Sequence, residues 1–456
     1  MRKTVVLNVV GLSRSLIGEE TPFLSKWLKD KILSNVKPIL PAVTCSSQST
    51  YLTGKYPDEN GIVGNGWYFE EECEVKFWKQ SNKLVQAEKV WETAQKRNPA
   101  FTCANMFWWY NMYATTNFSV TPRPIYCADG RKIPDCYTQP YELRDLLQTK
   151  LGRFPLFEYW GPRASIRSTQ WIAKASKIVD ELYNPDLTLI YLPHLDYPLQ
   201  KYGNNPEKIK KDLRSIDGIC EDLIKFYEKK RANIILLSEY GITDVSNPIH
   251  LNRIFRVNGL IKVREELGLE VFDPGASAAF AVADHQVAHV YVNDKEKINQ
   301  VRDILTTIEG IELVLDEEGK KKFRIDHPRA GDFVVVADSK SWFTYYYWLD
   351  DSKAPDYART VDIHRKPGYD PVELFLNPAI KALPLKVAIK LLKKKVGFRT
   401  LLDIIPLDAT LVKGSHGRIP EDKNFWPVLA TEGLTISEIE PYQVYDLILE
   451  KLELGG

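Results

Sequence analysis

Short apolar runs rich in valine and isoleucine alternate with amphipathic helical patterns along much of the chain. Such runs occupy residues 4–10, Leu187 to Leu192 and Ile234 to Leu237. Between the last two runs, a segment that begins at Asn205-Pro206 repeats apolar residues at helical spacing, namely Ile209, Leu213, Ile216, Leu223 and Tyr227. Continuous apolar strands joined by helices are typical of a parallel sheet with helices on both faces, so the sequence predicts an α/β fold.

Three short segments follow these predicted strands directly. They are Val10-Gly11, His194-Leu195-Asp196 and Ser238-Glu239-Tyr240-Gly241. In open α/β sheets, ligands bind at the carboxyl ends of the strands. The three segments are therefore candidates for the functional site.

The 456 residues, of which 44% are hydrophobic, indicate a soluble globular protein with one large domain over residues 1–456 and a smaller one inserted into it or appended to it. The 61 basic and 60 acidic residues leave a net charge of +1, which gives no reason to expect nucleic acid as a partner. The amino-terminal sequence MRKTVVLNVVGL is interpreted as a first strand rather than a signal peptide, and no transmembrane segment is expected. The six cysteines show no metal-binding spacing, so we expect reduced thiols and a cytoplasmic protein.

The stretch from Pro41 to Asn65, PAVTCSSQSTYLTGKYPDENGIVGN, places hydroxyl side chains at a predicted helix start. Proline is excluded from a helix interior and Thr and Ser cap free amides, so the helix is predicted to begin near Thr44. A hydroxyl there lies where backbone N–H groups and the helix dipole favour negative charge, which suits attack on a phosphoryl group. The alternative is that Thr44 or Ser46 is only an N-cap.

Two segments differ in composition from the rest. Residues 55–150 are rich in aromatic side chains, including Trp67, and are predicted to form an inserted cap over the site, the alternative being ordinary core. Residues 375–405 are predicted as a basic helical insertion, in which Lys381 to Arg399 joins apolar residues to a lysine-rich face. That helix could lie on an anionic membrane, and the alternative is a solvated face on a docked helix.

Several short motifs occur in a fixed order along most of the chain. They are the first strand into Gly11, the Thr-Pro helix at 21, PAVTCSSQSTYLTGKYP, NGIVGN, DYPLQKYG at 196–203, LLSEYGIT at 236–243, DHPRAGD at 326–332 and KGSHGR at 413–418. Their order and spacing resemble the nucleotide pyrophosphatase/phosphodiesterase branch of the alkaline phosphatase superfamily. The resemblance implies a three-layer, alkaline-phosphatase-like sandwich with a mostly parallel central sheet and the aromatic-rich cap inserted into it.

The resemblance also implies a hydrolase of phosphodiester or pyrophosphate bonds, or of phosphomonoesters, acting on a phosphorylated small molecule. In that family two metal ions, usually zinc, flank a threonine or serine that attacks phosphorus. Carried over by position, the implied nucleophile is Thr44. The implied metal ligands are Asp196, Glu239 and His416.

Four positions depart from the family's pattern. Val10 stands where the family has an aspartate, and Ser47 stands where it often has an asparagine. Gln200 and Tyr240 stand where the family has histidines. Valine cannot ligate a metal, and glutamine and tyrosine are poor ligands for zinc. A standard two-zinc site therefore cannot be assembled from these positions.

The leading hypothesis is a metal-dependent hydrolase with a single-metal or relocated site, to which His364 in a turn-rich segment adds a ligand. The cofactor would be one or two divalent ions, zinc in preference to magnesium or manganese. Candidates for substrate binding are Ser47, Gln200, Tyr240 and Trp67. An alternative of a different class is a catalytically inactive, phosphodiesterase-like protein that binds a phosphorylated or aromatic small molecule. A third hypothesis, peripheral membrane work on a lipid phosphate, depends only on the helix at 381–399.

Overall fold

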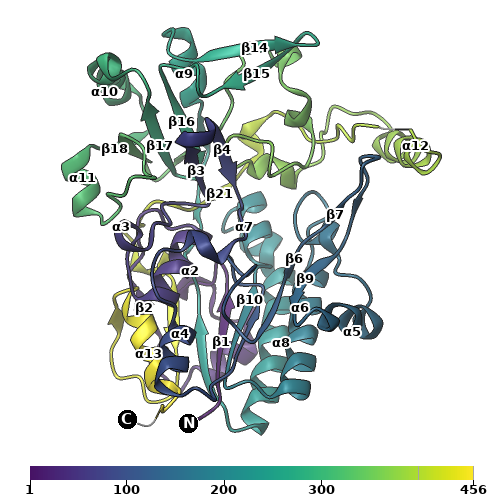
Figure 1. Ribbon diagram of the computed structural model, residues 1–456, viewed down its shortest axis with the longest axis vertical. Helices are drawn as coiled ribbons and strands as arrows, with labels where there is room; N and C mark the ends of the chain where they lie inside the picture. The colour runs from purple at the N-terminus through teal and green to yellow at the C-terminus, as the bar shows by residue number, and fades with distance from the viewer. Residues whose placement is uncertain (399, 455–456) are drawn as a thin grey trace.

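A nine-stranded sheet forms the centre of the protein (Figure 1). The computed structural model describes residues 1–398 and 400–454. The strands lie in the order β23 (Glu438–Ile439), β2 (Ser34–Val36), β22 (Val428–Ala430), β11 (Asn233–Leu237), β1 (Thr4–Val9), β10 (Leu187–Leu192), β5 (Cys103–Met106), β6 (Phe118–Pro122) and β9 (Cys136–Gln139). Strands β11, β1, β10, β5 and β6 are parallel neighbours, whereas β22 and β9 pair with them antiparallel. The predicted, mostly parallel α/β sheet is confirmed.

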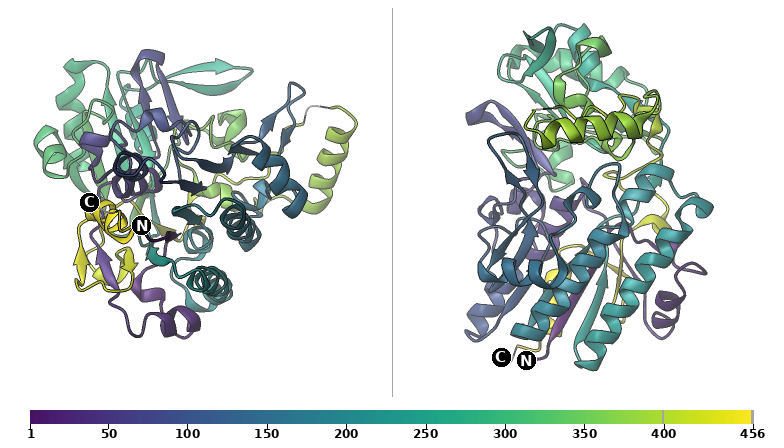
Figure 2. Two further views of the ribbon diagram at one scale, coloured as in Figure 1. Left: turned by 60° about the horizontal axis from the view of Figure 1, so that its bottom comes forward. Right: turned by 90° about the vertical axis from the view of Figure 1, so that its right-hand side faces the viewer.

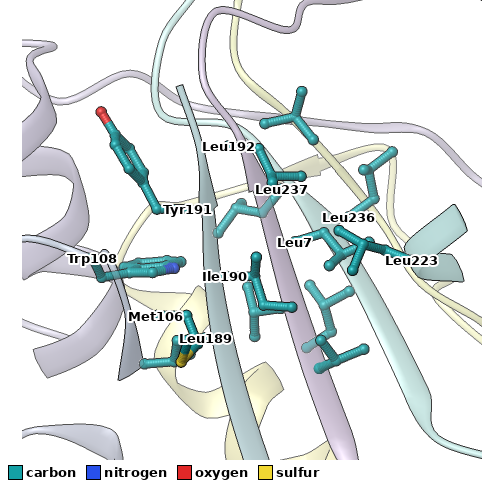
Figure 3. Close-up of a cluster of buried hydrophobic side chains, with 14 of the residues drawn as sticks. Leu7, Met106, Trp108, Leu189, Ile190, Tyr191, Leu192, Leu223, Leu236 and Leu237 are labelled. Carbon is teal, nitrogen blue, oxygen red and sulfur yellow. The ribbon is translucent and has the colours of Figure 1, made fainter. Parts of the chain in front are cut away.

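The middle strands are apolar along most of their length because both faces of the sheet are covered. Every residue of β1, β10 and β11 is buried. Figure 3 shows Leu7, Ile190 and Leu236 from these strands together with Leu223 from a covering helix. Full burial of each such side chain contributes roughly 1.5–3 kcal/mol, so this cluster stabilises the sheet that positions the site.

Helices pack on the two faces of the sheet. One group contains α1 (Pro22–Trp27), α6 (Ile166–Tyr183) and α8 (Pro206–Lys229), and the other contains α2 (Thr44–Thr53), α4 (Val90–Arg97) and α13 (Gln443–Lys451). Figure 2 shows the teal helices α6 and α8 and the yellow α13 on opposite sides of the sheet. The predicted helix start at Asn205-Pro206 is confirmed, since the Asn205 side chain accepts a hydrogen bond from the Lys208 amide at 3.2 Å.

A second, smaller lobe lies above the sheet in Figure 1. Its four-stranded sheet has the order β16 (Ala279–Asp284), β17 (Val287–Val292), β19 (Phe333–Ala337) and β18 (Ile311–Leu315), and every pairing is antiparallel. Around it lie α9 (Leu251–Val257), α10 (Ile298–Thr307), α11 (Glu317–Lys322) and the hairpin of β14 (Lys262–Glu266) and β15 (Leu269–Asp273). A smaller inserted or appended domain was predicted but its residues were not, because fully buried strands such as β16 and β17 lack the alternation that marks half-exposed antiparallel pairs.

The segment 55–150, predicted as a cap, is divided between two places. Its strands β5, β6 and β9 belong to the central sheet, with β5 paired to β10. The segment's other part includes α3 (Pro57–Asn60) and the hairpin of β3 (Gly66–Phe69) and β4 (Glu74–Phe77). In this hairpin, Tyr68 packs edge-on against Phe280 and Tyr291 of the second lobe. Its aromatic side chains therefore join the two lobes as core.

Two elements stand at the right-hand edge of the molecule in Figure 1. They are α12 (Leu383–Lys395), which lies inside the predicted insertion at 375–405, and the hairpin of β7 (Ile125–Tyr126) and β8 (Lys132–Ile133). Across the described ranges, no helix combines the length and apolar character that crossing a bilayer requires.

Candidate active site

Residues that follow two strands of the central sheet and one residue from the start of a helix meet at one edge of the sheet. Thr44 is the first residue of α2, as predicted. Asp196 begins α7 (Asp196–Tyr202) just after β10, and Glu239 and Tyr240 follow β11. Because β10, β1 and β11 are parallel neighbours, their carboxyl ends share this edge. All four side chains are buried there.

The Tyr240 hydroxyl lies between Thr44 and Asp196. It is 3.2 Å from Oγ1 of Thr44, and it donates a hydrogen bond of 3.1 Å to Oδ1 of Asp196. Since the tyrosine proton is directed at the carboxylate, the threonine hydroxyl is the group that donates to Tyr240. The three side chains form one continuous path for a proton from Thr44 to Asp196.

The second oxygen of Asp196 is held by an amide. Gln200 donates from Nε2 to Oδ2 of Asp196 at 2.8 Å, and its carbonyl oxygen accepts a hydrogen bond of 2.9 Å from the Tyr369 hydroxyl. Burial raises the pKa of Asp196 to about 7, although the hydrogen bonds from Gln200 and Tyr240 lower it. Gln200 therefore presents N–H groups, not a free oxygen, to the centre of the site.

His416 lies beside the same carboxylate. Its Nδ1 bonds the Ala42 carbonyl at 2.8 Å, which leaves Nε2 unprotonated, without a hydrogen-bond partner and 3.8 Å from Oδ1 of Asp196. The ring stacks on Tyr240 at 3.6 Å and lies 3.7 Å from the ring of His285. Burial lowers the pKa of His416 well below its usual range, so the imidazole is neutral.

Glu239 also lies beside Thr44, whose hydroxyl is among the hydrogen-bonding groups that lower the pKa of this carboxyl. Its Oε1 accepts a hydrogen bond of 2.5 Å from Asn8 and another from the Gln48 amide, while Oε2 lacks a partner. Burial, chiefly, raises the pKa of Glu239 to about 8. At neutral pH this carboxyl is mostly protonated and adds little negative charge to the site.

Replacing Glu239 with glutamine is expected to change how stability depends on pH. Burial raises the pKa of Glu239 from 4.5 to about 8. In the pH range between these two values, the folded protein keeps a proton on Glu239 that the unfolded chain has released. The free energy of unfolding of the wild type therefore falls as pH rises through this range. Glutamine cannot ionise, so the variant should gain on the order of 4 kcal/mol relative to the wild type between about pH 5 and about pH 9.

Urea unfolding at several pH values measures this difference. The control is Glu432→Gln, because Glu432 is exposed. The explanation would be wrong if the two variants showed the same pH dependence.

Asn65 connects the start of α2 to the second lobe. Its Oδ1 accepts a hydrogen bond of 3.0 Å from the Cys45 amide, next to Thr44. Its own amide groups donate to both oxygens of Asp284 at 2.8 and 3.0 Å, and Asp284 also bonds Nδ1 of His285 at 2.9 Å. The position of Thr44 therefore depends on contacts with both lobes.

The donors at this edge of the sheet do not match the implied metal ions. Over residues 1–398 and 400–454, no three His, Cys, Asp or Glu side chains lie together in a way that could hold an ion. Asp196 and His416 are close, but both neighbours of the carboxylate, Gln200 and Tyr240, direct protons at it. A catalytic zinc site typically uses three protein ligands, so these residues fit neither the two-ion centre nor a three-ligand zinc site.

The other predicted site residues lie away from this edge or face elsewhere. His364 contacts the Phe77 carbonyl at 3.5 Å, and burial, followed by the charge of Lys132, lowers its pKa to about 4. Trp67 stacks on Phe69 at 5.2 Å inside a buried apolar cluster. Ser47 is buried in α2, where its amide bonds the Val43 carbonyl. The four predicted metal ligands are thus not brought into one group.

Several contacting residues were not predicted as site residues: Asn8, Gln48, Asn65, His285 and Tyr369. Two of them have a sequence feature that could have indicated a place in the site. Asn8 is a polar residue inside an apolar strand, and Gln48 lies one helical turn after Thr44 on the same face. The others reach the site from distant loops, which a single sequence does not bring together.

The chain is similar in sequence to one protein family and to several curated proteins. The chain matches the family described as type I phosphodiesterase / nucleotide pyrophosphatase over residues 4–370. It is 20% identical over 311 residues to an ectonucleotide pyrophosphatase/phosphodiesterase of Caenorhabditis elegans, a match that covers 66% of this chain and 34% of the relative. It is 24% identical over 236 residues to an uncharacterized pyrophosphatase/phosphodiesterase of Schizosaccharomyces pombe, covering 49% of this chain and 41% of the relative. The chain thus spans less than half the length of these curated relatives.

Solved structures share the fold at low identity. The murine ectonucleotide pyrophosphatase/phosphodiesterase 5 superposes with a TM-score of 0.60 at 14% identity, over 100% of this chain and 96% of that one. An inactive variant of the murine protein, in complex with AMP, gives a TM-score of 0.61 at 13% identity, with the same coverage. Phosphonoacetate hydrolase from Sinorhizobium meliloti, in complex with phosphonoacetate, gives 0.61 at 13% identity over 99% of this chain and 96% of that one.

Proposed function

Because the chain belongs to the type I phosphodiesterase/nucleotide pyrophosphatase family of the alkaline phosphatase superfamily, we propose that it hydrolyses a phosphodiester, pyrophosphate or phosphomonoester bond. The proposed substrate is a nucleotide-like small molecule, since a relative of the same fold binds AMP. Thr44 is the proposed nucleophile.

The observation that carries this proposal is the hydrogen-bonded path from Thr44 through Tyr240 to Asp196. As Oγ1 of Thr44 attacks phosphorus, its proton passes to the Tyr240 oxygen, and the tyrosine proton passes to Oδ1 of Asp196. The bond from phosphorus to the leaving group breaks, and the leaving group departs as the anion with the electron pair of that bond. Water then attacks the phosphoryl group on Thr44 and loses a proton to solvent or to the departed anion. The bond from phosphorus to Oγ1 breaks, and Oγ1 recovers its proton from Asp196 through Tyr240. Burial raises the pKa of Asp196 to about 7, which suits a general base at neutral pH.

The start of α2 supports the same reaction. Thr44 is the first helical residue, so the amides of the first turn and the helix dipole favour the negative charge of phosphoryl oxygens beside it. Members of this family are typically metal-dependent. Since the described donors do not fit the family's metal centre, we assign removal of the threonine proton to Tyr240 and Asp196 instead.

Hydrolysis of a chromogenic phosphodiester, followed across pH, tests this assignment. Asp196 must be ionised to receive the proton, so kcat/KM should rise with pH and level off above about pH 7. Asp196→Asn should lower the rate by about 100-fold or more and remove this rise. The control is Asp212→Asn, because Asp212 bonds His194 at 2.9 Å outside the path.

Elemental analysis and chelator treatment of the same samples complete the test. Activity should persist after the chelator. Activity that is lost with chelator and restored by zinc, magnesium or manganese would instead assign one ion to Asp196 and His416.

A second candidate function, non-catalytic binding of a phosphorylated small molecule, is favoured by one observation. Members of this family are typically metal-dependent, yet among the described residues no three His, Cys, Asp or Glu side chains form a group that could hold an ion. Calorimetric titration with AMP distinguishes the two functions. Binding of AMP by a wild type that turns over no phosphate ester at any pH would favour the binding protein.

A further inference from the structure

Helix α12 and the three residues that follow it leave apolar side chains uncovered. Ile389, Leu392 and Val396 follow one another at helical spacing, and they are 46%, 63% and 64% exposed. Leu391 and Phe398 add side chains that are 53% and 65% exposed. Soluble proteins rarely expose neighbouring apolar side chains of this size unless the patch has a partner.

The other side of the helix is held against the protein. Val387 packs on the core cluster of the second lobe, and Lys386 and Lys390 form ion pairs with Asp403. These contacts fix the rotation of the helix. The stripe of Ile389, Leu392 and Val396 is therefore directed away from the body, where Figure 1 shows α12 at the edge of the molecule.

The segment around the helix carries one sign of charge. Between Glu373 and Asp403 the sequence contains no acidic residue. Its basic residues are Lys381, Lys386, Lys390, Lys393, Lys394, Lys395 and Arg399. A single carboxylate, Asp403, pairs with Lys386 and Lys390, and the segment as a whole remains strongly positive.

The β7–β8 hairpin extends the same surface. Its exposed side chains Ile125 and Tyr126 are 43% and 53% exposed, and Lys132 lies 5.7 Å from the centre of the Tyr126 ring. Figures 1 and 2 both place the tip of this hairpin beside α12. We call α12 and this hairpin tip together the α12 surface.

We propose that the α12 surface binds the face of an anionic lipid bilayer. Lysine-rich helices with a large apolar stripe lie in the plane of the interface, with the apolar side chains inserted below the head groups. The basic residues complement anionic lipids, and the attraction weakens as salt screens it. A nucleic acid would use the charge but leave the apolar stripe in water, so the combination favours a lipid surface.

Co-sedimentation of the full chain with vesicles tests this proposal. Vesicles of phosphatidylcholine containing phosphatidylserine are compared with vesicles of phosphatidylcholine alone, at low and at physiological salt. The variant Leu392→Asp/Val396→Asp removes the stripe. The matched control is Val257→Asp/Leu349→Asp, because these apolar side chains are 68% and 55% exposed. Both line one pocket at the end of α9, a helix that Figure 1 shows apart from α12.

The wild type and the control should bind the anionic vesicles and not the neutral ones, with weaker binding at higher salt. The affinity of the α12 variant for these vesicles should fall by at least about tenfold, because each apolar side chain lost from the interface removes its transfer free energy. Circular dichroism checks that each variant is folded.

Three results would overturn the proposal. The first is no binding of the wild type to anionic vesicles at low salt. The second is unchanged binding by the folded α12 variant, and the third is equal loss in both variants. Binding to duplex DNA that is as tight as vesicle binding, and unaffected by the α12 variant, would mark the surface as a general polyanion site instead.

Discussion

Replacing Thr44 with alanine is expected to abolish hydrolysis of phosphate esters. The hydroxyl is the atom that attacks phosphorus in the proposed reaction, and it begins the proton path to Asp196 through a contact of 3.2 Å with Tyr240. Nothing else in the proposal replaces a missing nucleophile, so the loss should be on the order of 10⁴-fold or more in kcat. Steady-state kinetics with a chromogenic phosphodiester measures it.

A matched control lies on the same helix. Thr50 is buried in α2, and its hydroxyl has no hydrogen-bond partner among the described residues. Thr50→Ala removes the same atoms from an equally buried position and should keep most of the activity. Thr44→Ser should retain part of the activity because it keeps the hydroxyl. Full turnover by Thr44→Ala would remove the nucleophile from the account.

The second large effect is expected for Tyr240→Phe. Phenylalanine keeps the ring that stacks on His416 but loses the hydroxyl that joins Thr44 to Asp196. General acid–base catalysis typically contributes about 10²- to 10⁴-fold, so kcat/KM should fall by that amount while the fold is retained. The variant should also lose the rise in rate that follows ionisation of Asp196.

Tyr51→Phe provides the comparison for this variant. Tyr51 is a fully buried tyrosine of α2 whose hydroxyl donates to the Ser238 carbonyl at 3.0 Å, outside the proton path. Its loss should affect stability more than rate. A wild-type rate and pH profile in Tyr240→Phe, or an equal loss of rate in both variants, would contradict the proposed path.

Much of the central fold follows from the sequence. Strands β1, β10 and β11 and helix α8 were predicted because complete burial gives long apolar runs and amphipathic packing gives a helical period. The residues of the second lobe were not predicted, because the buried strands β16 and β17 lack the alternation of a half-exposed antiparallel pair. Residues 55–150 do not form a separate cap layer, because the apolar run that contains β5 pairs with β10 in the central sheet.

The site was predictable to the extent that it depends on strand ends. Asp196 and Tyr240 lie together because they follow β10 and β11, the two parallel neighbours of β1, whereas Thr44 comes from the start of α2. The donors that hold Asp196 were less accessible to prediction, because side-chain orientation decides them. Gln200 was considered as a weak ligand or substrate contact, whereas its amide nitrogen donates to Asp196 and its oxygen is taken by Tyr369.

The α12 surface is independent of the hydrolytic site. None of its residues takes part in the path from Thr44 to Asp196, so loss of vesicle binding in the α12 variant should leave kcat on a soluble substrate unchanged. A soluble chromogenic diester and a vesicle assay on the same preparations therefore keep the two proposals separate.

Acid quenching of the protein during turnover of a nucleoside 5′-(4-nitrophenyl) phosphate, followed by peptide mass spectrometry, tests the central claim most directly. A nucleotidyl group on the peptide that contains Thr44, present in the wild type and absent from Thr44→Ala, is the predicted result. Turnover without an adduct on Thr44, or with an adduct on another residue, would contradict the account.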